Sequence, residues 1–490
     1  MAARKCHILV VGCGIGGLAS AVSALESGAD VTILERAPFD ERGGQTRYTE
    51  AYFRMKSETE VSDDFEMHLA ANSSGYIDPL LVNETAADPD TWPRVARGLS
   101  LTDPDFISTL ATEAGPTVTW LKRFRIRFDF LPTQFLTKSQ PRLLPVGGGL
   151  ALVEGLAAEA ERQGAKFLYE TTATSLVLDD SGRVAGVVAS TQGGPARIIS
   201  ADAVVLACGG FEGNAEMMTR YVGPRSVYLR PICRGGYFNK GEGVRMALEI
   251  GAAPNGDFGS YHAEPIDPRS GVSEPSVFIF PYGILVNRSG HRFTDEAPGT
   301  VDAYYERVTR QIYAQDGGIA FAVLDAKHMD IPNYRLGIRT DKPPIVADTI
   351  EELAGRIDVP PAGLRLTVEA YNSACRPGSY DPLKLDGRAT EGLDPKKSHW
   401  ALPLDRAPYH AYPIISANVF TFGGLKVDRY ARVLNLDGYP IAGLYAAGEI
   451  IGTYYGNYTG ATSVLKGATF GRIGGQHAVA TSAQDKRPAD

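Results

Sequence analysis

The 490-residue sequence predicts an α/β protein in which a domain with a parallel sheet is interrupted by an inserted second domain. Three observations predict this fold class. The apolar run 7–11 leads through a glycine-rich turn into an apolar helix pattern. Strand-like apolar runs return late in the chain, at 422–428 and 443–449. The stretch 265–415 differs from both, because it is rich in Pro, Tyr and Arg and consists of short segments.

Residues 7–36 have the pattern of a strand, a glycine turn, a helix and a second strand. In the turn, Gly12 allows a tight bend, Gly14 lets the backbone approach a pyrophosphate, and Gly17 lets the helix pack closely on the strand. Unpaired N–H groups and the helix dipole favour phosphates at the N-terminus of this helix.

An acidic residue ends the second strand of this unit. Glu35 lies where a carboxylate accepts hydrogen bonds from an adenosine ribose, and Arg36 follows it. The order strand, turn, helix, strand, acid therefore predicts dinucleotide binding. A glycine-rich turn without a ligand is the alternative, but it does not explain Glu35.

Further elements follow in order along the chain. Gly147–Gly149 opens a helix, and the turn 179–183 joins two strands into a hairpin. The run 202–211 reads as a later buried strand of the first sheet that ends in a glycine turn. The sequence predicts helices over 105–125, 150–163 and 463–479, and strands over 166–170, 175–178 and 184–188. We assign 1–264 and 416–490 to the first domain and 265–415 to the inserted domain.

The composition is that of a soluble globular enzyme, with 44% apolar and 22% charged residues and a net charge of −8. The absence of a basic run argues against nucleic acid as a partner. No apolar stretch reaches the roughly 18 residues of a transmembrane segment, and the first strand begins too early for a signal peptide.

The five cysteines are scattered and form no CxxC motif, so no iron–sulfur, haem or zinc site, and no metal, is expected. The protein is expected to be cytoplasmic.

Three motifs together resemble the FAD-binding fumarate reductase/succinate dehydrogenase flavoprotein family, which includes 3-ketosteroid dehydrogenases. They are the glycine turn with Glu35, the run 207–211 and the run 444–449. Finer motifs span nearly the whole chain in the family's order and are most similar to the tricarballylate dehydrogenase subgroup. These are 43–47, 241–247, 261–267, 281–287, 292–296 and 457–460.

The resemblance implies a Rossmann-like FAD-binding domain with an inserted α+β cap, or substrate, domain. FAD is expected to be non-covalent, because no histidine lies near Arg47–Thr49, where members with covalent FAD carry one. Ser463 and Val464 would face the flavin N1 and C2=O, where a helix N-terminus suits negative charge. The implied FAD-binding residues are Gly12, Gly14, Gly17, Glu35, Arg36, Gly43, Gly44, Gln45, Thr46, Ala173, Ala207, Gly209, Gly241, Glu242, Gly448, Glu449, Ser463 and Val464.

The chain departs from the fumarate reductases at three places. Thr300 stands where the family has a proton-donating arginine, and Asn418 begins the segment that lacks the fumarate-binding histidine. Tyr458 replaces a carboxylate-binding arginine. Fumarate reduction itself is therefore not expected.

Tyrosines are the first candidate catalytic residues. Tyr458, with the Gly460 region, would polarise a substrate carbonyl or carboxyl, as a tyrosine does in the ketosteroid dehydrogenases; the alternative is a tyrosine packed under the flavin. Tyr304 or Tyr305 would act as the base. Because free tyrosine has a pKa near 10, that role needs a cation such as Arg292 or a relay. The alternative is that both are core residues.

Three other residues have open assignments. His262 would bind a carboxylate or relay a proton, or is a structural histidine. Glu296, in the motif that begins at Arg292, would support the site or hold the cap by an ion pair. Tyr282 lines the cleft or belongs to the cap core.

The resemblance implies a dehydrogenase that oxidises a CH–CH bond next to a carbonyl or carboxyl by hydride transfer to flavin N5. The small-molecule substrate would be a small organic acid or a cyclic ketone. The alternatives are an ene-reductase of the fumarate reductase type and a non-catalytic flavin-binding redox protein. The electron acceptor stays open between oxygen, a quinone and a redox protein.

Overall fold

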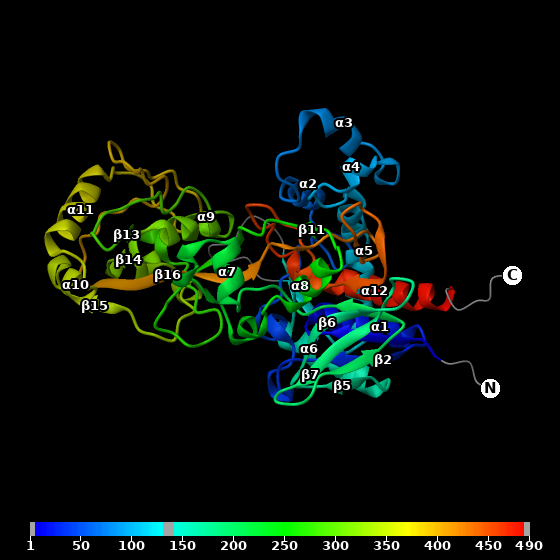
Figure 1. The fold of residues 1–490 in the computed structure, drawn as a ribbon. Coiled ribbons are helices and arrows are strands. Elements are labelled where there is room, and N and C mark those ends of the chain that lie inside the picture. Colours follow the sequence, from blue (N-terminus) through cyan, green and yellow to red (C-terminus); the bar gives the residue numbers. More distant parts are fainter. Residues whose placement is uncertain (1–4, 131–141, 485–490) are drawn as a thin grey trace.

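The computed structural model describes residues 5–130 and 142–484 (Figure 1). A six-stranded sheet in the order β18-β19-β9-β1-β2-β5 forms the first domain. All neighbouring strands are parallel except the edge strand β18, which runs antiparallel to β19. Its strands are β1 (His7–Val11), β2 (Asp30–Leu34), β5 (Lys166–Leu168), β9 (Ala203–Leu206), β18 (Arg432–Leu434) and β19 (Pro440–Ala446). The predicted parallel sheet and the α/β class are confirmed.

Helices near both ends of the chain pack on this sheet, and other helices lie elsewhere in the first domain or in the cap. The helices are α1 (Ile15–Glu26), α2 (Phe65–Ala71), α3 (Val82–Thr85), α4 (Arg94–Arg97), α5 (Pro104–Lys122), α6 (Gly148–Arg162), α7 (Ala215–Tyr221), α8 (Glu242–Glu249), α9 (Val301–Ala314), α10 (Ile350–Arg356), α11 (Pro361–Ala374) and α12 (Ser463–Gln484). In the part of the chain that the structure describes, none of these helices has the length and hydropathy needed to span a bilayer.

Glycines let α1 lie directly on β1 and on α12. A Cβ on Gly17 would lie 1.9 Å from the carbonyl oxygen of Gly12, as expected for the third glycine of the turn. On α12, a Cβ on Gly471 would lie 2.5 Å from the Gly16 oxygen, and one on Gly475 would lie 2.2 Å from the Ser20 oxygen. The two helices therefore pack backbone against backbone.

The predicted hairpin is present, with longer strands than expected. β6 (Thr171–Leu178) and β7 (Val184–Thr191) pair antiparallel, and β8 (Arg197–Ser200) adds a third strand. Asp179 N donates to the Arg183 carbonyl at 2.9 Å in the connecting turn. The last helix also exceeds its predicted end at 479, because Thr481 donates to the His477 carbonyl and bonds Tyr445 Oη at 2.9 Å.

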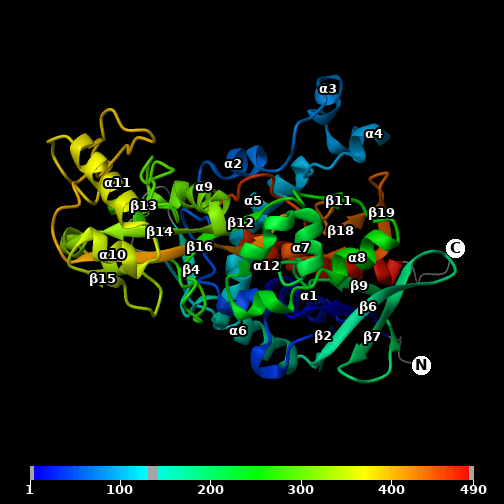
Figure 2. The ribbon, with the colours of Figure 1, turned by 60° about the vertical axis from the view of Figure 1, so that its left-hand side comes forward.

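A second sheet, in the order β10-β16-β14-β13, forms the core of the cap, with β12 and β15 also paired to β16. Figures 1 and 2 both show α10, α11 and β13–β15 at the opposite end of the molecule from α1 and β2. The cap strands are β10 (Arg230–Pro231), β12 (Tyr261–Ile266), β13 (Ile284–Val286), β14 (Ile319–Leu324), β15 (Ile345–Ala347) and β16 (Tyr409–Thr421). Two short pairs, β3 (Phe128–Phe130) with β4 (Leu143–Pro145) and β11 (Pro254–Asn255) with β17 (Gly424–Leu425), complete the strands.

The two long strands β12 and β16 connect the domains. They pair antiparallel, with Tyr261 opposite Thr421 at one end and Ile266 opposite Ile415 at the other. The boundaries that the sequence predicts, at 264/265 and 415/416, both fall within these strands and remain predictions. The cap therefore continues from the first domain through hydrogen-bonded strands.

We predict that Gly475→Ala will lower the free energy of unfolding by about 1–3 kcal/mol, the usual cost of overpacking. The reason is that the added Cβ would lie 2.2 Å from the Ser20 oxygen. Urea denaturation of the apoprotein would measure the change. Gly271→Ala is the control, because its Cβ meets nothing within 4 Å. Equal stability of the two variants would contradict the described packing of α1 on α12.

Candidate active site

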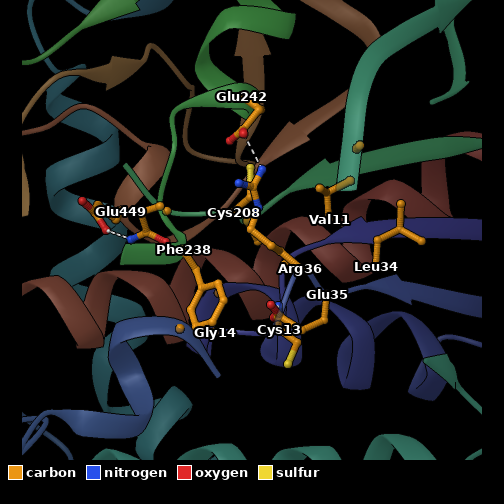
Figure 3. Close-up of a pocket in the computed structure, with 18 of the residues that line it drawn as sticks. Val11, Cys13, Gly14, Leu34, Glu35, Arg36, Cys208, Phe238, Glu242 and Glu449 are labelled. Carbon is orange, nitrogen blue, oxygen red and sulfur yellow. Dashed lines mark hydrogen bonds and ion pairs between the residues drawn. The ribbon is translucent and has the colours of Figure 1, made fainter. Parts of the chain in front are cut away.

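The carboxyl edge of the main sheet carries a pocket where β1, β2 and β9 end (Figure 3). This is the place at which doubly wound sheets bind their ligands. The 44–46 segment, the start of β6 and the turn after β19 close the pocket. Its lining includes Val11–Gly16, Leu34–Arg36, 44–46, 171–173, Ala207–Gly209 and 448–449.

The glycine turn is shaped for a phosphate. Gly12 has a φ of +102°, and a Cβ there would lie 2.4 Å from the Ala207 oxygen. Helix α1 begins directly after Gly14, and Ile15 N donates to Thr46 Oγ1 at 3.1 Å. The turn thus leads the first N–H groups of α1 to the pocket, which favours a bound anion.

The carboxylate of Glu35 connects the glycine turn to the end of β2. It accepts hydrogen bonds from Cys13 N at 3.0 Å and from Ala37 N at 2.7 Å, and the residue is 6% exposed. Backbone donors therefore fix the position of the carboxylate oxygens in the lining of the pocket. The sequence identified this residue from its place after the second strand.

An ion pair joins Arg36 and Glu242 across the pocket (Figure 3). Arg36 follows β2, whereas Glu242 begins α8, so the pair links two segments far apart in sequence. Gly241, which precedes α8, has a φ of +77°, in the region that favours glycine. Both charged residues were predicted from the sequence, but their pairing was not.

Two buried carboxyl groups meet at the other end of the pocket. Glu449 accepts from Thr421 N at 3.0 Å and from Asn239 Nδ2 at 3.1 Å. Glu212 accepts from the same Asn239 amide at 2.6 Å and from Gln45 Nε2 at 2.7 Å. Burial raises the pKa of both carboxyls, and the charge of Glu449 raises that of Glu212 further. No sequence motif marks Glu212 or Asn239, so their place at the pocket was not predicted.

The structure brings most of the predicted cofactor residues to this pocket. Gly17, Gly43 and Gly241 are outside its lining and shape the backbone instead; Gly43 has a φ of +107°. Ser463 and Val464 line a second cavity. The predicted residues in the first lining are Gly12, Gly14, Glu35, Arg36, Gly44, Gln45, Thr46, Ala173, Ala207, Gly209, Glu242, Gly448 and Glu449. This set of a glycine turn, a helix N-terminus and an acid fits FAD.

The second cavity has a volume of about 920 Å³, which lies in the range of small-molecule sites. Residues of α9 and β12 form one side, and the 457–464 segment with the end of β16 forms another. Four of the predicted catalytic residues line it together: Tyr458, Tyr304, Tyr305 and His262.

His262 and Tyr305 form a hydrogen-bonded pair in this cavity. His262 Nε2 lies 2.6 Å from Tyr305 Oη, and the His262 ring packs 4.5 Å from the Tyr458 ring. Burial lowers the pKa of His262 to about 3, so its imidazole is neutral. Burial also raises the pKa of Tyr305 well above its usual range, so its phenol is protonated. The pair therefore carries a proton without a net charge.

Tyr458 caps the last helix in this structure. Its hydroxyl oxygen accepts from Thr462 N at 3.0 Å and from Ser463 N at 3.1 Å, and it also lies 3.0 Å from Ser463 Oγ. The expected role of Tyr458 as a donor to a substrate carbonyl remains a prediction. In this structure the hydroxyl oxygen of Tyr458 instead accepts hydrogen bonds from backbone N–H groups at the N-terminus of α12.

Arg292 and Glu296 lie outside the lining of either cavity. Arg292 Nη2 is 2.7 Å from Glu296 Oε2 in a buried ion pair, and Glu296 also accepts from Leu285 N at 3.0 Å. Because Leu285 belongs to β13, the pair fastens the connecting loop to the cap sheet. The structure therefore favours the cap-holding alternative for Glu296, and it gives Arg292 no place beside Tyr305. Tyr282 lies in the cap core, with its hydroxyl on the Pro382 carbonyl at 2.6 Å.

Glu306 is a cavity residue that sequence analysis missed. It accepts from Ala263 N at 3.5 Å and from Tyr458 N at 3.2 Å, and it pairs with Arg310 at 3.0 Å. The carboxylate thereby ties α9 to β12 and to the 457–464 segment. An acid in the middle of an amphipathic helix gives no sequence signal for such a role.

We predict that Glu35→Ala will lower the fraction of protein that keeps FAD through dialysis. It will also lower the free energy of unfolding of the apoprotein by about 1–3 kcal/mol, because Cys13 N and Ala37 N lose their acceptor. Flavin absorbance and urea denaturation would measure the two effects. Asp30→Ala, at the exposed start of β2, is the control. Full flavin retention by Glu35→Ala would contradict a ribose contact.

Residues 7–465 match the family described as FAD binding domain. The chain is 28% identical to NADH:acrylate oxidoreductase of Vibrio harveyi over 96% of its own length, but it spans 50% of that protein. It is 26% identical to vinyl phenol reductase of Lactiplantibacillus plantarum, with 96% of each chain covered. Its fold matches the open conformation of a flavocytochrome c3 fumarate reductase with a TM-score of 0.73 and 25% identity, covering 98% of this chain and 79% of that one.

These similarities confirm the predicted resemblance to the fumarate reductase flavoproteins and the fold with an inserted cap. They also confirm FAD as the cofactor and the oxidoreductase class, whose members act on CH–CH or C=C bonds. The finer similarity to tricarballylate dehydrogenase stays a prediction. The chain belongs to the FAD binding domain family of flavin-dependent oxidoreductases.

Proposed function

We propose that this protein transfers a hydride and a proton across a carbon–carbon bond next to a carbonyl or carboxyl group of a small organic acid or cyclic ketone. The observation that carries the proposal is the Tyr305–His262 pair, which lies in a cavity of about 920 Å³ beside the N-terminus of α12. The relatives named for acrylate and vinyl phenol support a small unsaturated substrate.

Bound FAD supplies the hydride acceptor or donor. The chain supplies the binding groups for it: the glycine turn with the N-terminus of α1 for the pyrophosphate, and Glu35 for the ribose. Val464, at the start of α12, would place its N–H group toward the flavin pyrimidine ring. Ser463 lies beside it at the cavity, with its own N–H donating to Tyr458 Oη. Each of these residues lines one of the two cavities.

The protonation state of Tyr305 defines the form in which the resting protein starts a reaction. Burial raises the pKa of Tyr305, so Oη holds its proton at neutral pH. Donation of that proton to a substrate carbon leaves a phenolate, which takes a new proton from solvent before the next turnover. Acting as a base would require Oη to pass its own proton to His262 Nε2 first, and the low pKa of His262 opposes that transfer. The resting pair is in the form from which reduction of a C=C bond begins, and one relative is named vinyl phenol reductase. We therefore propose reduction as the working direction, with desaturation as the alternative.

Aromatic side chains around the pair limit the access of water. Phe278 packs edge-on to Tyr305 with ring centroids 5.5 Å apart, and Phe420 lies 5.2 Å from His262. Such walls keep the Tyr305 proton for the substrate and strengthen polar contacts inside the cavity.

We propose that electrons enter or leave through an external carrier, either oxygen, a quinone or a redox protein, and that the enzyme is cytoplasmic. Stopped-flow oxidation of the reduced protein by each carrier class would identify the carrier. If no carrier class raises the oxidation rate of the reduced protein above its spontaneous rate, the proposal of these carriers is contradicted.

We predict that Tyr305→Phe will slow flavin oxidation by an unsaturated substrate by about 10²–10⁴-fold, the usual contribution of a positioned acid. FAD content should be unchanged, because Tyr305 is outside the cofactor pocket. Tyr304→Phe is the matched control on the same helix, since it lines the cavity without bonding His262. A larger loss in Tyr304→Phe would assign the proton transfer to that residue instead.

We predict that the chemically reduced holoprotein will be reoxidised under anaerobic conditions by an unsaturated acid or enone. Absorbance of the oxidised flavin band reports the reaction. Bleaching of the oxidised protein by the saturated compounds, without the reverse reaction, would establish desaturation as the working direction. The unsaturated compounds to test are acrylate, cinnamate and cyclohexenone. If neither they nor their saturated counterparts change the absorbance of the flavin band, the result would support a non-catalytic flavoprotein.

A further inference from the structure

Arg142 is a cavity residue without an assigned role. It directly precedes β4, whose backbone is held by two bonds to Phe53: Leu143 N donates to the Phe53 oxygen at 3.0 Å, and Phe53 N donates to the Leu143 oxygen at 2.7 Å. The Arg142 side chain lines the second cavity and is 13% exposed. The hydrogen-bonded start of β4 therefore fixes the backbone from which the largely buried Arg142 side chain extends.

In the part of the chain that the structure describes, the Arg142 guanidinium lacks a close acceptor. Among the described residues its carboxylate neighbour is Asp302, with an N–O distance of 3.7 Å, and no hydrogen bond joins it to another described residue. Two other arginines of the cavity have tight partners, since Arg54 lies 2.7 Å from Asp64 and Arg339 lies 3.0 Å from Glu50. Charge-assisted hydrogen bonds have distances of about 2.7–2.9 Å. A buried cation without such a bond is costly unless a ligand supplies it.

The position of Arg142 is next to the reacting groups. Its two terminal nitrogens lie 3.3 and 3.5 Å from the point that a Cβ on Gly460 would occupy, so the glycine leaves room for the guanidinium. Burial raises the pKa of Tyr305, and the Arg142 cation opposes that rise, which places the charge near the phenol. Arg142 thus lies between Tyr305 and the segment that contains Gly460.

We propose that Arg142 binds a carboxylate of the substrate, so that the substrate is an organic acid rather than an uncharged ketone. The planar guanidinium offers paired N–H donors that match the two oxygens of a carboxylate. This inference rests on the proposed function and adds the substrate class. It also explains how the chain binds an acid although Thr300 and Tyr458 replace the arginines expected there. Tyr458 does not compete for this role, because its oxygen caps α12.

Titration of the oxidised holoprotein with saturated ligands tests the proposal without turnover, provided that only ligands that leave the flavin oxidised enter the comparison of affinities. The probes are propanoate, 3-phenylpropanoate and cyclohexanecarboxylate, each paired with its primary amide, and the readout is perturbation of the flavin absorbance. We expect wild type to bind at least one acid about 10- to 100-fold more tightly than its amide, the usual worth of a hydrogen-bonded charge. Arg142→Met should remove this preference and leave amide affinity and flavin content unchanged.

Two further variants make the outcome specific. Arg142→Lys keeps the charge without the paired donors, and it should retain part of the preference. Arg335→Met removes an exposed arginine of the same cavity and should retain all of it. Absence of an acid preference in wild type, or its survival in both Arg142 variants, would overturn the proposal. Selective acid binding by a protein that fails every anaerobic redox test would uphold Arg142 while contradicting the proposed function.

Discussion

The close contact of backbone with backbone at the carboxyl edge of the main sheet is the constraint on which the other features depend. A Cβ on Gly12 would lie 2.4 Å from the Ala207 oxygen, and one on Gly16 would lie 2.7 Å from the Ala447 carbonyl carbon. Segments from the start, middle and end of the chain meet there with no side chain between them. The cofactor pocket follows from this contact, because the same turns that approach one another also direct N–H groups and carboxylates to one place.

Pairs of buried titratable groups occur at both cavities. Glu212 and Glu449 meet through the amide of Asn239, and Tyr305 and His262 meet directly. In each case burial disfavours the charged form: it raises the pKa of both carboxyls and of Tyr305, and it lowers that of His262. The interior thus stores protons without isolated charges, which suits a reaction that moves a hydride and a proton together.

The sequence predicted the cofactor domain better than the cavity, for a physical reason. The glycine turn, Glu35 and the turn at Gly448 are local patterns in which neighbouring residues define the function. The cavity instead combines single residues from distant elements, such as Arg142 beside β4 and Glu306 on α9, and neither has a local signature. The motif that begins at Arg292 is a candidate only through its resemblance to a family motif, which leaves both site support and a cap-holding ion pair open. In the structure Arg292 and Glu296 pair with each other, and Glu296 accepts from Leu285 N of β13.

The pairing of β12 with β16, with β10 paired to the other edge of β16, makes the joint between the domains a ribbon of hydrogen-bonded strands rather than a pair of loose linkers. His262 is on this ribbon and Tyr305 is on the cap helix α9, with 2.6 Å between their bonded atoms. A ribbon bends and twists far more readily than it stretches, so the cap has few ways to move. Any movement that lifts α9 from β12 also parts the two atoms that share the proton. A movement of that kind would therefore open the cavity and disable the proton pair together.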